Sequence, residues 1–267
     1  MTQKTAKKTI TLSRKTITLS RLTGYLDTLL DIKSYSRDSS LNGLQVEGSK
    51  TVAKITLAVD ACEESIRRAV RNRSDMLLVH HGLLWGDPVP VTGIMARRVG
   101  LLLKHGISLY AAHLPLDCHP ATGNNARMAQ LLGIETMERF GEYQGYLIGF
   151  CGRLPSPLTV KSFSAKIRKM TGESVRTFPF GKDMVRKVGI ISGGAASMVK
   201  DAAEADCDTM LTGETAHSAY HTAREYGVNL VCGGHYGTET FGVKALGDMI
   251  GSEFGLDVRF IDIPTGL

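Results

Sequence analysis

The strongest constraint on how this chain folds comes from two apolar segments that each end in histidine and glycine. Residues 76–82 read Met-Leu-Leu-Val-His-His-Gly, so an apolar run stops at a histidine pair. Residues 229–239 read Asn-Leu-Val-Cys-Gly-Gly-His-Tyr-Gly-Thr-Glu, where a second apolar run breaks at glycines before His235 and Glu239. Short apolar runs are typical of buried strands in a parallel sheet, and open α/β proteins place their sites at the carboxyl ends of such strands. We therefore expect both segments to meet at one site.

The sequence between residues 54 and 117 alternates between strand and helix patterns. Strands are predicted at 55–59, 76–81 and 108–112, and helices at 63–72 and 94–104. An amphipathic helix is predicted before them, at 22–32, because its leucines follow helical spacing. The order β-α-β-α-β is typical of right-handed crossovers and a parallel sheet.

A similar pattern recurs later in the chain. Residues 187–191 resemble 54–58, and residues 208–211 resemble 75–78, at the same offset of 133. Between them, a strand is predicted at 146–154, a helix at 160–170 with Phe163, Ile167 and Met170 facing inward, and a strand at 174–180, with Pro155, Pro157 and Gly181 as punctuation. A chance match of short apolar strings is the alternative. We predict an α/β fold of two related halves with largely parallel sheets, residues 22–131 and 132–267.

The first 21 residues differ from the rest. They contain six basic residues and no acidic one, and the heptapeptide Lys-Thr-Ile-Thr-Leu-Ser-Arg occurs at 8–14 and again at 15–21. Two identical copies cannot occupy the same structural position, so at most one is expected to dock. We predict residues 1–21 to be a flexible, dispensable tail, which accounts for the whole net charge of +6. Contact of this basic tail with nucleic acid and a targeting role are weaker alternatives.

The cysteine pattern and hydropathy indicate a cytoplasmic protein. The five cysteines form no Cys-x-x-Cys pair, so neither a disulfide framework nor a thiolate zinc site is expected. No apolar run approaches the roughly 20 residues that a membrane span needs. The first residues also lack the apolar core of a secretory signal, so no membrane association is predicted.

Five side chains near predicted strand ends are candidate metal ligands: His80, His81, Asp117, His235 and Glu239. Imidazoles and carboxylates suit divalent ions such as Zn, Mn, Fe, Co or Ni. Five ligands exceed what one open tetrahedral site needs, so we predict two ions that share a carboxylate and a bridging water. The structural alternative is that the histidines cap a strand and Glu239 begins a helix. Adjacent strand side chains point apart, so joint binding by the histidine pair requires the backbone to leave strand geometry, as Gly82 permits.

Other polar motifs give weaker signals. His113 and His119 flank Asp117 and are candidates for proton transfer, with an ordinary loop histidine as the alternative for each. His217 and His221 lie four residues apart in a predicted helix and fit a rim or an interface better than a metal. The amides of residues 192–197 could hold a phosphate, although a tight turn explains these glycines equally well. No Gly-x-Ser-x-Gly elbow, P-loop or Rossmann fingerprint is present, so nucleophilic serine and nucleoside-triphosphatase chemistry lack support.

The sequence resembles the Nif-three-like family, whose members are also described as GTP cyclohydrolase I type 2 homologues. The matching stretches are Asn-Gly-Leu-Gln-Val-Glu-Gly at 42–48, Val-His-His-Gly at 79–82, His-Leu-Pro-Leu-Asp at 113–117, Gly-Asn-Asn at 123–125, Thr-Gly-Glu at 212–214, Gly-His-Tyr-Gly-Thr-Glu at 234–239 and Phe-Ile-Asp-Ile-Pro at 260–264. The resemblance runs from about residue 22 to residue 267 and implies interlocked α/β domains and a ring-shaped homohexamer. It also implies a dinuclear metal centre on the same five side chains.

These observations lead to one functional prediction and one rival. The prediction is a dinuclear metal-dependent hydrolase that uses a metal-bridging water on a small molecule, for instance a nucleotide or a cyclic amide, with His113 or His119 protonating the leaving group. The family name implies conversion of GTP, although nothing in the sequence indicates recognition of a guanine ring. The rival is a non-catalytic metal-binding or regulatory hexameric ring.

Overall fold

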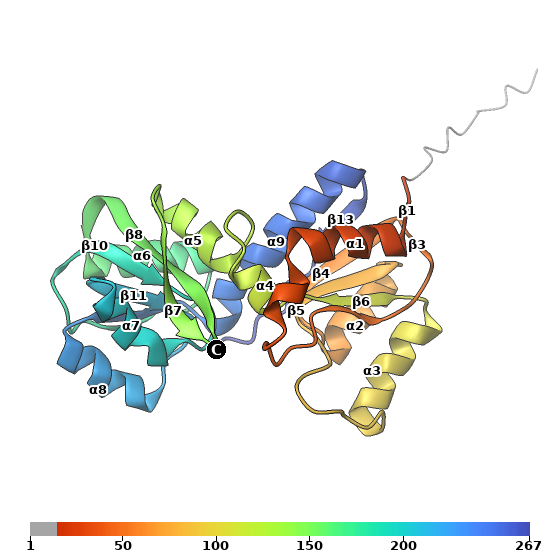
Figure 1. Ribbon diagram of the computed structural model, residues 1–267, viewed down its shortest axis with the longest axis horizontal. Coiled ribbons are helices and arrows are strands. Elements are labelled where there is room, and N and C mark those ends of the chain that lie inside the picture. Colours follow the sequence, from red (N-terminus) through yellow and green to blue (C-terminus); the bar gives the residue numbers. More distant parts are fainter. Residues whose placement is uncertain (1–14) are drawn as a thin grey trace, which may run out of the picture.

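The described part of the protein contains two large mixed β-sheets, each covered by helices on both faces, and a small two-stranded sheet (Figure 1). The computed structural model describes residues 15–267. Its elements in chain order are β1 (Ile17–Thr18), α1 (Leu19–Leu29), η1 (Ile32–Tyr35), β2 (Gly43–Val46), β3 (Thr51–Val52), β4 (Lys54–Asp60), α2 (Glu63–Arg71), β5 (Met76–His81), α3 (Gly93–Lys104), β6 (Ser108–Ala111), α4 (Leu114–Asp117), α5 (Asn124–Leu132), β7 (Glu138–Tyr143), β8 (Tyr146–Thr159), α6 (Val160–Thr171), β9 (Arg176–Phe178), β10 (Met184–Ile190), η2 (Ala196–Met198), α7 (Val199–Glu204), β11 (Thr209–Thr212), α8 (His217–Tyr226), β12 (Asn229–Cys232), α9 (His235–Phe254) and β13 (Asp257–Phe260). The α/β class predicted from the sequence is confirmed.

The first sheet has five strands in the order β13-β4-β5-β6-β2. The first four are parallel, and β2 runs antiparallel at one edge. Side chains alternate between the two faces of β5: Met76 and Leu78 pack with α1 and α9, whereas Leu77 and Val79 pack with α2 and α3. Burial on both faces explains why this strand reads as a continuous apolar run.

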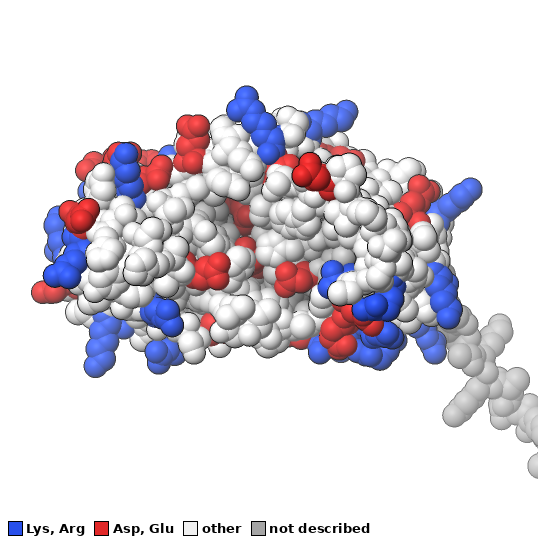
Figure 2. Space-filling view, turned by 90° about the horizontal axis from the view of Figure 1, so that it is seen from below, with Lys and Arg blue, Asp and Glu red and all other residues white. Residues whose placement is uncertain are grey.

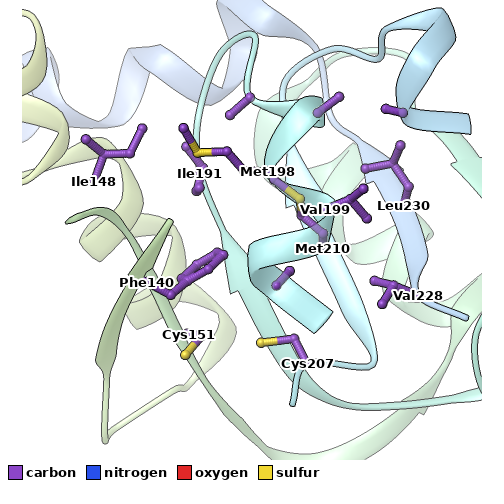
Figure 3. Packing of buried hydrophobic residues seen from close by; sticks show 14 of the residues in the cluster. Phe140, Ile148, Cys151, Ile191, Met198, Val199, Cys207, Met210, Val228 and Leu230 are labelled. Carbon is purple, nitrogen blue, oxygen red and sulfur yellow. The ribbon is translucent and has the colours of Figure 1, made fainter. Parts of the chain in front are cut away.

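The second sheet has six strands in the order β7-β8-β10-β11-β12-β9. Its three central strands β10, β11 and β12 are parallel, and β8 and β9 flank them in antiparallel orientation. One face packs Met210 and Leu230 against Val199 of α7 (Figure 3). The opposite face packs Leu211 and Val231 against Phe163 of α6. Each sheet therefore lies in the middle of a hydrophobic core, with apolar side chains packed on both of its faces.

The internal repeat predicted from the sequence is confirmed in the sheets. Each half places an antiparallel edge strand beside the third of its parallel strands, β2 beside β6 and β9 beside β12. The turn before the second parallel strand also repeats: Asp75 Oδ2 accepts hydrogen bonds from the amides of residues 53 and 54 at 2.8 and 2.9 Å, and Asp208 Oδ2 accepts from residues 186 and 187 at 2.9 and 3.1 Å. Each equivalent pair is 133 residues apart.

The two halves are interlocked, and their boundary differs from the predicted division at residue 131. Helix α5, which was assigned to the first half, packs Met128 and Leu132 in the core of the second sheet. Helix α9 starts beside the second sheet and then packs Val243 and Leu246 in the core of the first, where β13 pairs with β4. The predicted boundary is wrong because it divides the chain at a single point. The residues after 235 return to the first half. Among the described helices, none is both long and apolar enough to cross a membrane.

Strand β8 is longer than predicted because prolines do not end it. We expected Pro155 and Pro157 to follow the strand, but β8 continues through Thr159. The pairing with β10 is irregular at this point, where residues 154–157 lie opposite the single residue 186. Both prolines lie in this bulge, where no regular ladder hydrogen bond is needed.

The second copy of the duplicated heptapeptide is structured, which corrects the prediction of a flexible tail over residues 1–21. Residues 17 and 18 form β1, which pairs with β3, and Thr18 caps α1 by accepting a hydrogen bond from the Arg21 amide. Ile17 and Leu19 are buried in the first core. The first copy lies outside the described residues. The expectation that at most one copy docks therefore stays a prediction.

Matched substitutions in the two copies test this assignment. Ile17→Ala removes a buried side chain and should lower the free energy of unfolding by about 2 kcal/mol or more. Ile10→Ala makes the same change at the equivalent position of the first copy and should leave the stability within about 0.5 kcal/mol. Chemical denaturation of both variants measures the difference. Equal destabilisation by the two changes would contradict the docking of the second copy alone.

Candidate metal centre

The histidine pair lies at the carboxyl end of β5, and each ring is fixed by a different neighbouring strand. His80 Nδ1 donates to the Ala112 carbonyl at 2.8 Å, and His81 Nδ1 donates to Asp60 Oδ1 at 2.8 Å. The expectation that the backbone leaves strand geometry is wrong, because β5 includes both residues and His81 still pairs with Asp60 of β4. The rings nevertheless lie 4.6 Å apart between centroids. Anchoring through Nδ1 leaves Nε2 of both rings available on the inner side.

Glu239 lies at the centre of the cluster. Its Oε1 is 3.6 Å from His80 Nε2 and 3.3 Å from His235 Nε2, and its Oε2 is 3.4 Å from His81 Nε2. Glu239 and His235 are four residues apart in the first turns of α9, so both face the end of β5. The Glu239 side chain thus contacts histidines of both halves.

Asp117 is oriented by residues of both halves. It ends the short helix α4, and its Oδ2 is 3.4 Å from His80 Nε2. Its other oxygen, Oδ1, accepts hydrogen bonds from Asn124 Nδ2 and Ser192 Oγ, each at 2.8 Å. Asn124 in turn accepts from the amide of Gly242 in α9 at 2.6 Å. The structure therefore brings all five predicted ligands together.

The two predicted proton-transfer histidines have different surroundings. His113 Nδ1 donates to Asp38 Oδ1 at 2.9 Å, and its ring centroid is 5.2 Å from that of His80. His119 instead accepts hydrogen bonds at Nδ1 from its own loop, including Thr122 Oγ1 at 2.9 Å, and burial lowers its pKa. The structure thus places His113 at the cluster, whereas His119 is held as a loop histidine and lines none of the cavities beside the five ligands.

Charges within the cluster are balanced by mutual contacts. Burial opposes a charge on His80, but the carboxylates of Asp117 and Glu239 outweigh this and raise the pKa of His80 well above its usual value. The hydrogen bond to Glu239 raises the pKa of His235 to about 9. Burial acts to raise the pKa of Glu239, yet the charge of His80 and the hydrogen bond from His235 hold it below its usual range. At neutral pH the metal-free cluster therefore pairs two cations with buried carboxylates.

These residues fit a divalent metal ion. Two triads bring three ligand atoms within 4.8 Å of one another: His80, His81 and His113 form one, and His81, His235 and Glu239 form the other. His80 Nε2 and Glu239 Oε2 are buried and have no hydrogen-bond partner. A buried polar atom without a partner is costly, and a bound cation would satisfy both atoms. Neutral imidazoles and carboxylates are ligands that Zn, Mn, Fe, Co and Ni accept.

Three carboxylates that support the centre were missed by the sequence reasoning. Asp38 holds His113, Asp60 holds His81, and Glu214 lies 3.2 Å from His235 Nδ1. Asp60 ends the strand next to β5, so the rule that located the histidines would also have located it. Asp38 carries no such signal, since it precedes His113 by 75 residues in a loop. Such partners fix the tautomer and orientation of metal-binding histidines.

Three cavities border the cluster, and two of them include the side chain of Glu239. One of about 430 Å³ is lined by His81, Glu239, His235, Trp85 and Glu214, among others. The other, of about 230 Å³, is lined by Asp117, His113 and the segment 192–198. Figure 2 shows a hollow between the halves with acidic side chains inside it and basic ones mostly around the periphery. His217 and His221 of α8 line neither cavity.

Metal binding should release protons in a pH-dependent way. Because the pKa of His235 is about 9 without metal, this side chain is protonated at pH 7.5 and must lose its proton to become a ligand. The apparent affinity should therefore rise with pH up to about 9. Calorimetric titration in buffers of different ionisation enthalpy counts the protons. His235→Asn should reduce the count, while His217→Asn on α8 should leave it unchanged. An identical proton count in wild type and His235→Asn would contradict this ligand assignment.

Comparison with known proteins identifies many similar chains. Residues 17–266 match the model of a family described as Duf34/NIF3 (NGG1p interacting factor 3). A protein of Archaeoglobus fulgidus named GTP cyclohydrolase 1 type 2 homolog is 45% identical over 243 residues, which cover 91% of this chain and 97% of the relative. A protein of the same name from Deinococcus radiodurans is 42% identical over 243 residues, covering 91% of this chain and 92% of the relative.

Solved structures agree with the sequence comparisons. The crystal structure of a Thermus thermophilus protein superposes with a TM-score of 0.87 and 40% identity, covering 94% of this chain and all of the other. A structure of reduced HcgD from Methanocaldococcus jannaschii superposes with a TM-score of 0.81 and 25% identity, covering 93% and 99% of the two chains.

Proposed function

The chain belongs to the Duf34/NIF3 family, and on this premise we propose that its histidine and carboxylate cluster binds two divalent metal ions and hydrolyses a small molecule. The observation that carries the proposal is the position of Glu239. Its two buried oxygens face three histidines from two different halves, and one of these oxygens has no hydrogen-bond partner. A single carboxylate in this position suits a ligand shared by two ions.

Five residues would hold the ions: His80, His81, Asp117, His235 and Glu239. When bound, two such ions supply a water of lowered pKa and polarise an electrophilic carbonyl, ring-carbon or phosphoryl group. The chain itself fixes the ligands. Asp60 and the Ala112 carbonyl keep Nδ1 of the two β5 histidines protonated, so both present Nε2. Asn124 and Ser192 occupy one oxygen of Asp117 and leave the other for an ion.

His113 is suited to move a proton at its Nε2. Burial acts against ionisation of Asp38, but the hydrogen bond with His113 outweighs it and lowers the pKa of Asp38. The ionised carboxylate accepts the hydrogen bond from Nδ1 of His113 and so fixes the tautomer of the ring. This arrangement lets Nε2 accept or donate a proton beside the ligands, which is the role needed for a leaving group.

A substrate screen tests the hydrolase proposal. The metal-loaded protein should hydrolyse at least one member of a panel of nucleotides, including GTP, phosphoesters and cyclic amides. The names of the relatives support the inclusion of GTP. Asp117→Ala serves as the control, since it removes a ligand; turnover that persists in this variant would come from a contaminant. An absence of turnover with every metal would instead favour a metal-binding or regulatory ring.

We also propose that the protein assembles into a hexameric ring. Supporting observations are the resemblance described above and the exposed apolar side chains of the first half, which include Leu41, Val91 and Ile94, between 56 and 61% exposed. Light scattering on the purified chain should report a mass about six times that of the 28.9 kDa protomer. A monomer at micromolar concentrations would contradict this proposal.

A further inference from the structure

Arg98 is a partly buried cation to which the metal centre gives no role. It lies on α3, and its Nε is buried without a hydrogen-bond partner among the described residues. No carboxylate in the described part of the chain lies within ion-pair distance of its guanidinium. Residues 1–14 contain neither Asp nor Glu, so they offer it no carboxylate either. A buried Nε–H without a partner is costly, and an acceptor from outside the chain would satisfy it.

The neighbouring arginines are all paired. On α2, Arg67 contacts Glu63, and Arg68 and Arg71 contact Glu64, at 2.6 to 3.1 Å. Arg97, adjacent to Arg98 on α3, has its Nε 3.6 Å from Glu63. Arg98 therefore differs from its neighbours by lacking an acidic partner and by lining a cavity instead.

This cavity adjoins the metal centre. It has a volume of about 380 Å³, and its lining includes Arg98, Cys62, Asp60 and His81. It shares Asp60, His81 and Tyr236 with the cavity of about 430 Å³ that includes the side chain of Glu239. A small molecule in the cavity of about 380 Å³ can therefore contact both Arg98 and His81.

We propose that Arg98 binds an oxyanion group of the substrate, a phosphate or a carboxylate, while the reacting group lies at the metal centre. The inference rests on the proposed hydrolase function and narrows its substrate to anionic small molecules. The planar guanidinium forms paired hydrogen bonds with either oxyanion. The carboxylate of Asp60 lines the same cavity and repels an anion, so the anionic group should lie at Arg98 and the reacting group on the side of His81.

Titration of the metal-free full-length chain with inorganic phosphate and with acetate, at constant ionic strength, tests the site. Arg98→Met keeps the aliphatic stem and should weaken oxyanion binding roughly tenfold or more, because charge-assisted hydrogen bonds are lost. Arg98→Lys keeps the charge without the planar fork and should give an intermediate loss. Arg97→Met, on the same helix, should bind as the wild type does. If Arg98→Met weakens phosphate binding more than acetate binding, the substrate group is a phosphate. If it weakens acetate binding more, the group is a carboxylate.

Equal binding by wild type and Arg98→Met, or no binding of either probe by wild type, would overturn the assignment. Thermal unfolding of each variant excludes misfolding as the cause of a loss. Metal content is measured separately and should be unchanged in all three variants. Failure to bind metal would therefore contradict the hydrolase proposal without affecting the result at Arg98.

Discussion

Glu239→Gln should lower the affinity for both metal ions by at least about 100-fold. The substitution keeps the shape of the side chain but removes the charge that faces His80, His81 and His235. Loss of an outer-sphere partner alone typically costs 10- to 100-fold in metal affinity, so loss of a shared ligand should cost more. Equilibrium dialysis against Zn²⁺ or Mn²⁺, followed by elemental analysis, measures the loss.

Glu214→Gln is the matched control. This carboxylate is also close to His235, but it contacts Nδ1 rather than the side facing the cluster, and it is half exposed. Its loss should weaken only the ion that His235 holds, by about tenfold. If Glu239→Gln and Glu214→Gln had the same effect, Glu239 would not be the shared ligand.

Gly123→Ala should lower the free energy of unfolding by about 3 kcal/mol and weaken metal binding at Asp117. A Cβ atom at this position would lie 2.4 Å from the His119 carbonyl oxygen, 2.5 Å from that of Leu116 and 2.8 Å from that of Asp117. All three neighbours are backbone atoms, so relief requires movement of the segment that carries the ligand. Denaturant titration gives the stability, and metal analysis gives the loss at the site.

The same substitution at Gly24 should raise the free energy of unfolding instead of lowering it. Gly24 lies on the exposed side of α1, and nothing lies within 4 Å of a Cβ placed there. Alanine favours a helix over glycine, so Gly24→Ala should stabilise the protein by about 0.5–1 kcal/mol. Destabilisation by both changes would show that crowding does not explain the effect at residue 123.

Local pattern was sufficient to predict most of the parallel strands and to single out five side chains that the structure brings together. Met76 to Val79 are buried on alternate faces, and the chain direction of parallel strands places His80 and His81 at the same rim as the residues that follow β6. Glu239 follows β12 of the other sheet and contacts His81 across the two halves. The rule concerns neighbours in sequence and strand direction, so one chain is enough to apply it. The 133-residue offset was likewise readable because equivalent turns use the same aspartate contact.

Features that depend on contacts between distant segments were not predictable in this way. Asp38 and His113 come together only through the loop before β2, and Ser192 reaches Asp117 only because the halves interlock. The crossing of α9 was missed because a helix covered by two halves is apolar on several sides, which hides the point where it passes from one core to the other. Because the two heptapeptides are identical, their sequences cannot show which copy packs against the protein. The second copy continues directly into α1, and this connection places it there.

The number of metal ions per chain tests the central claim most directly. The wild-type protein, loaded with Zn²⁺ or Mn²⁺ and freed of unbound metal, is analysed for metal against protein concentration. The account predicts close to two ions per chain, because the cluster provides five ligands from both halves around one shared carboxylate. A ratio of one or of zero across both metals would contradict the dinuclear centre.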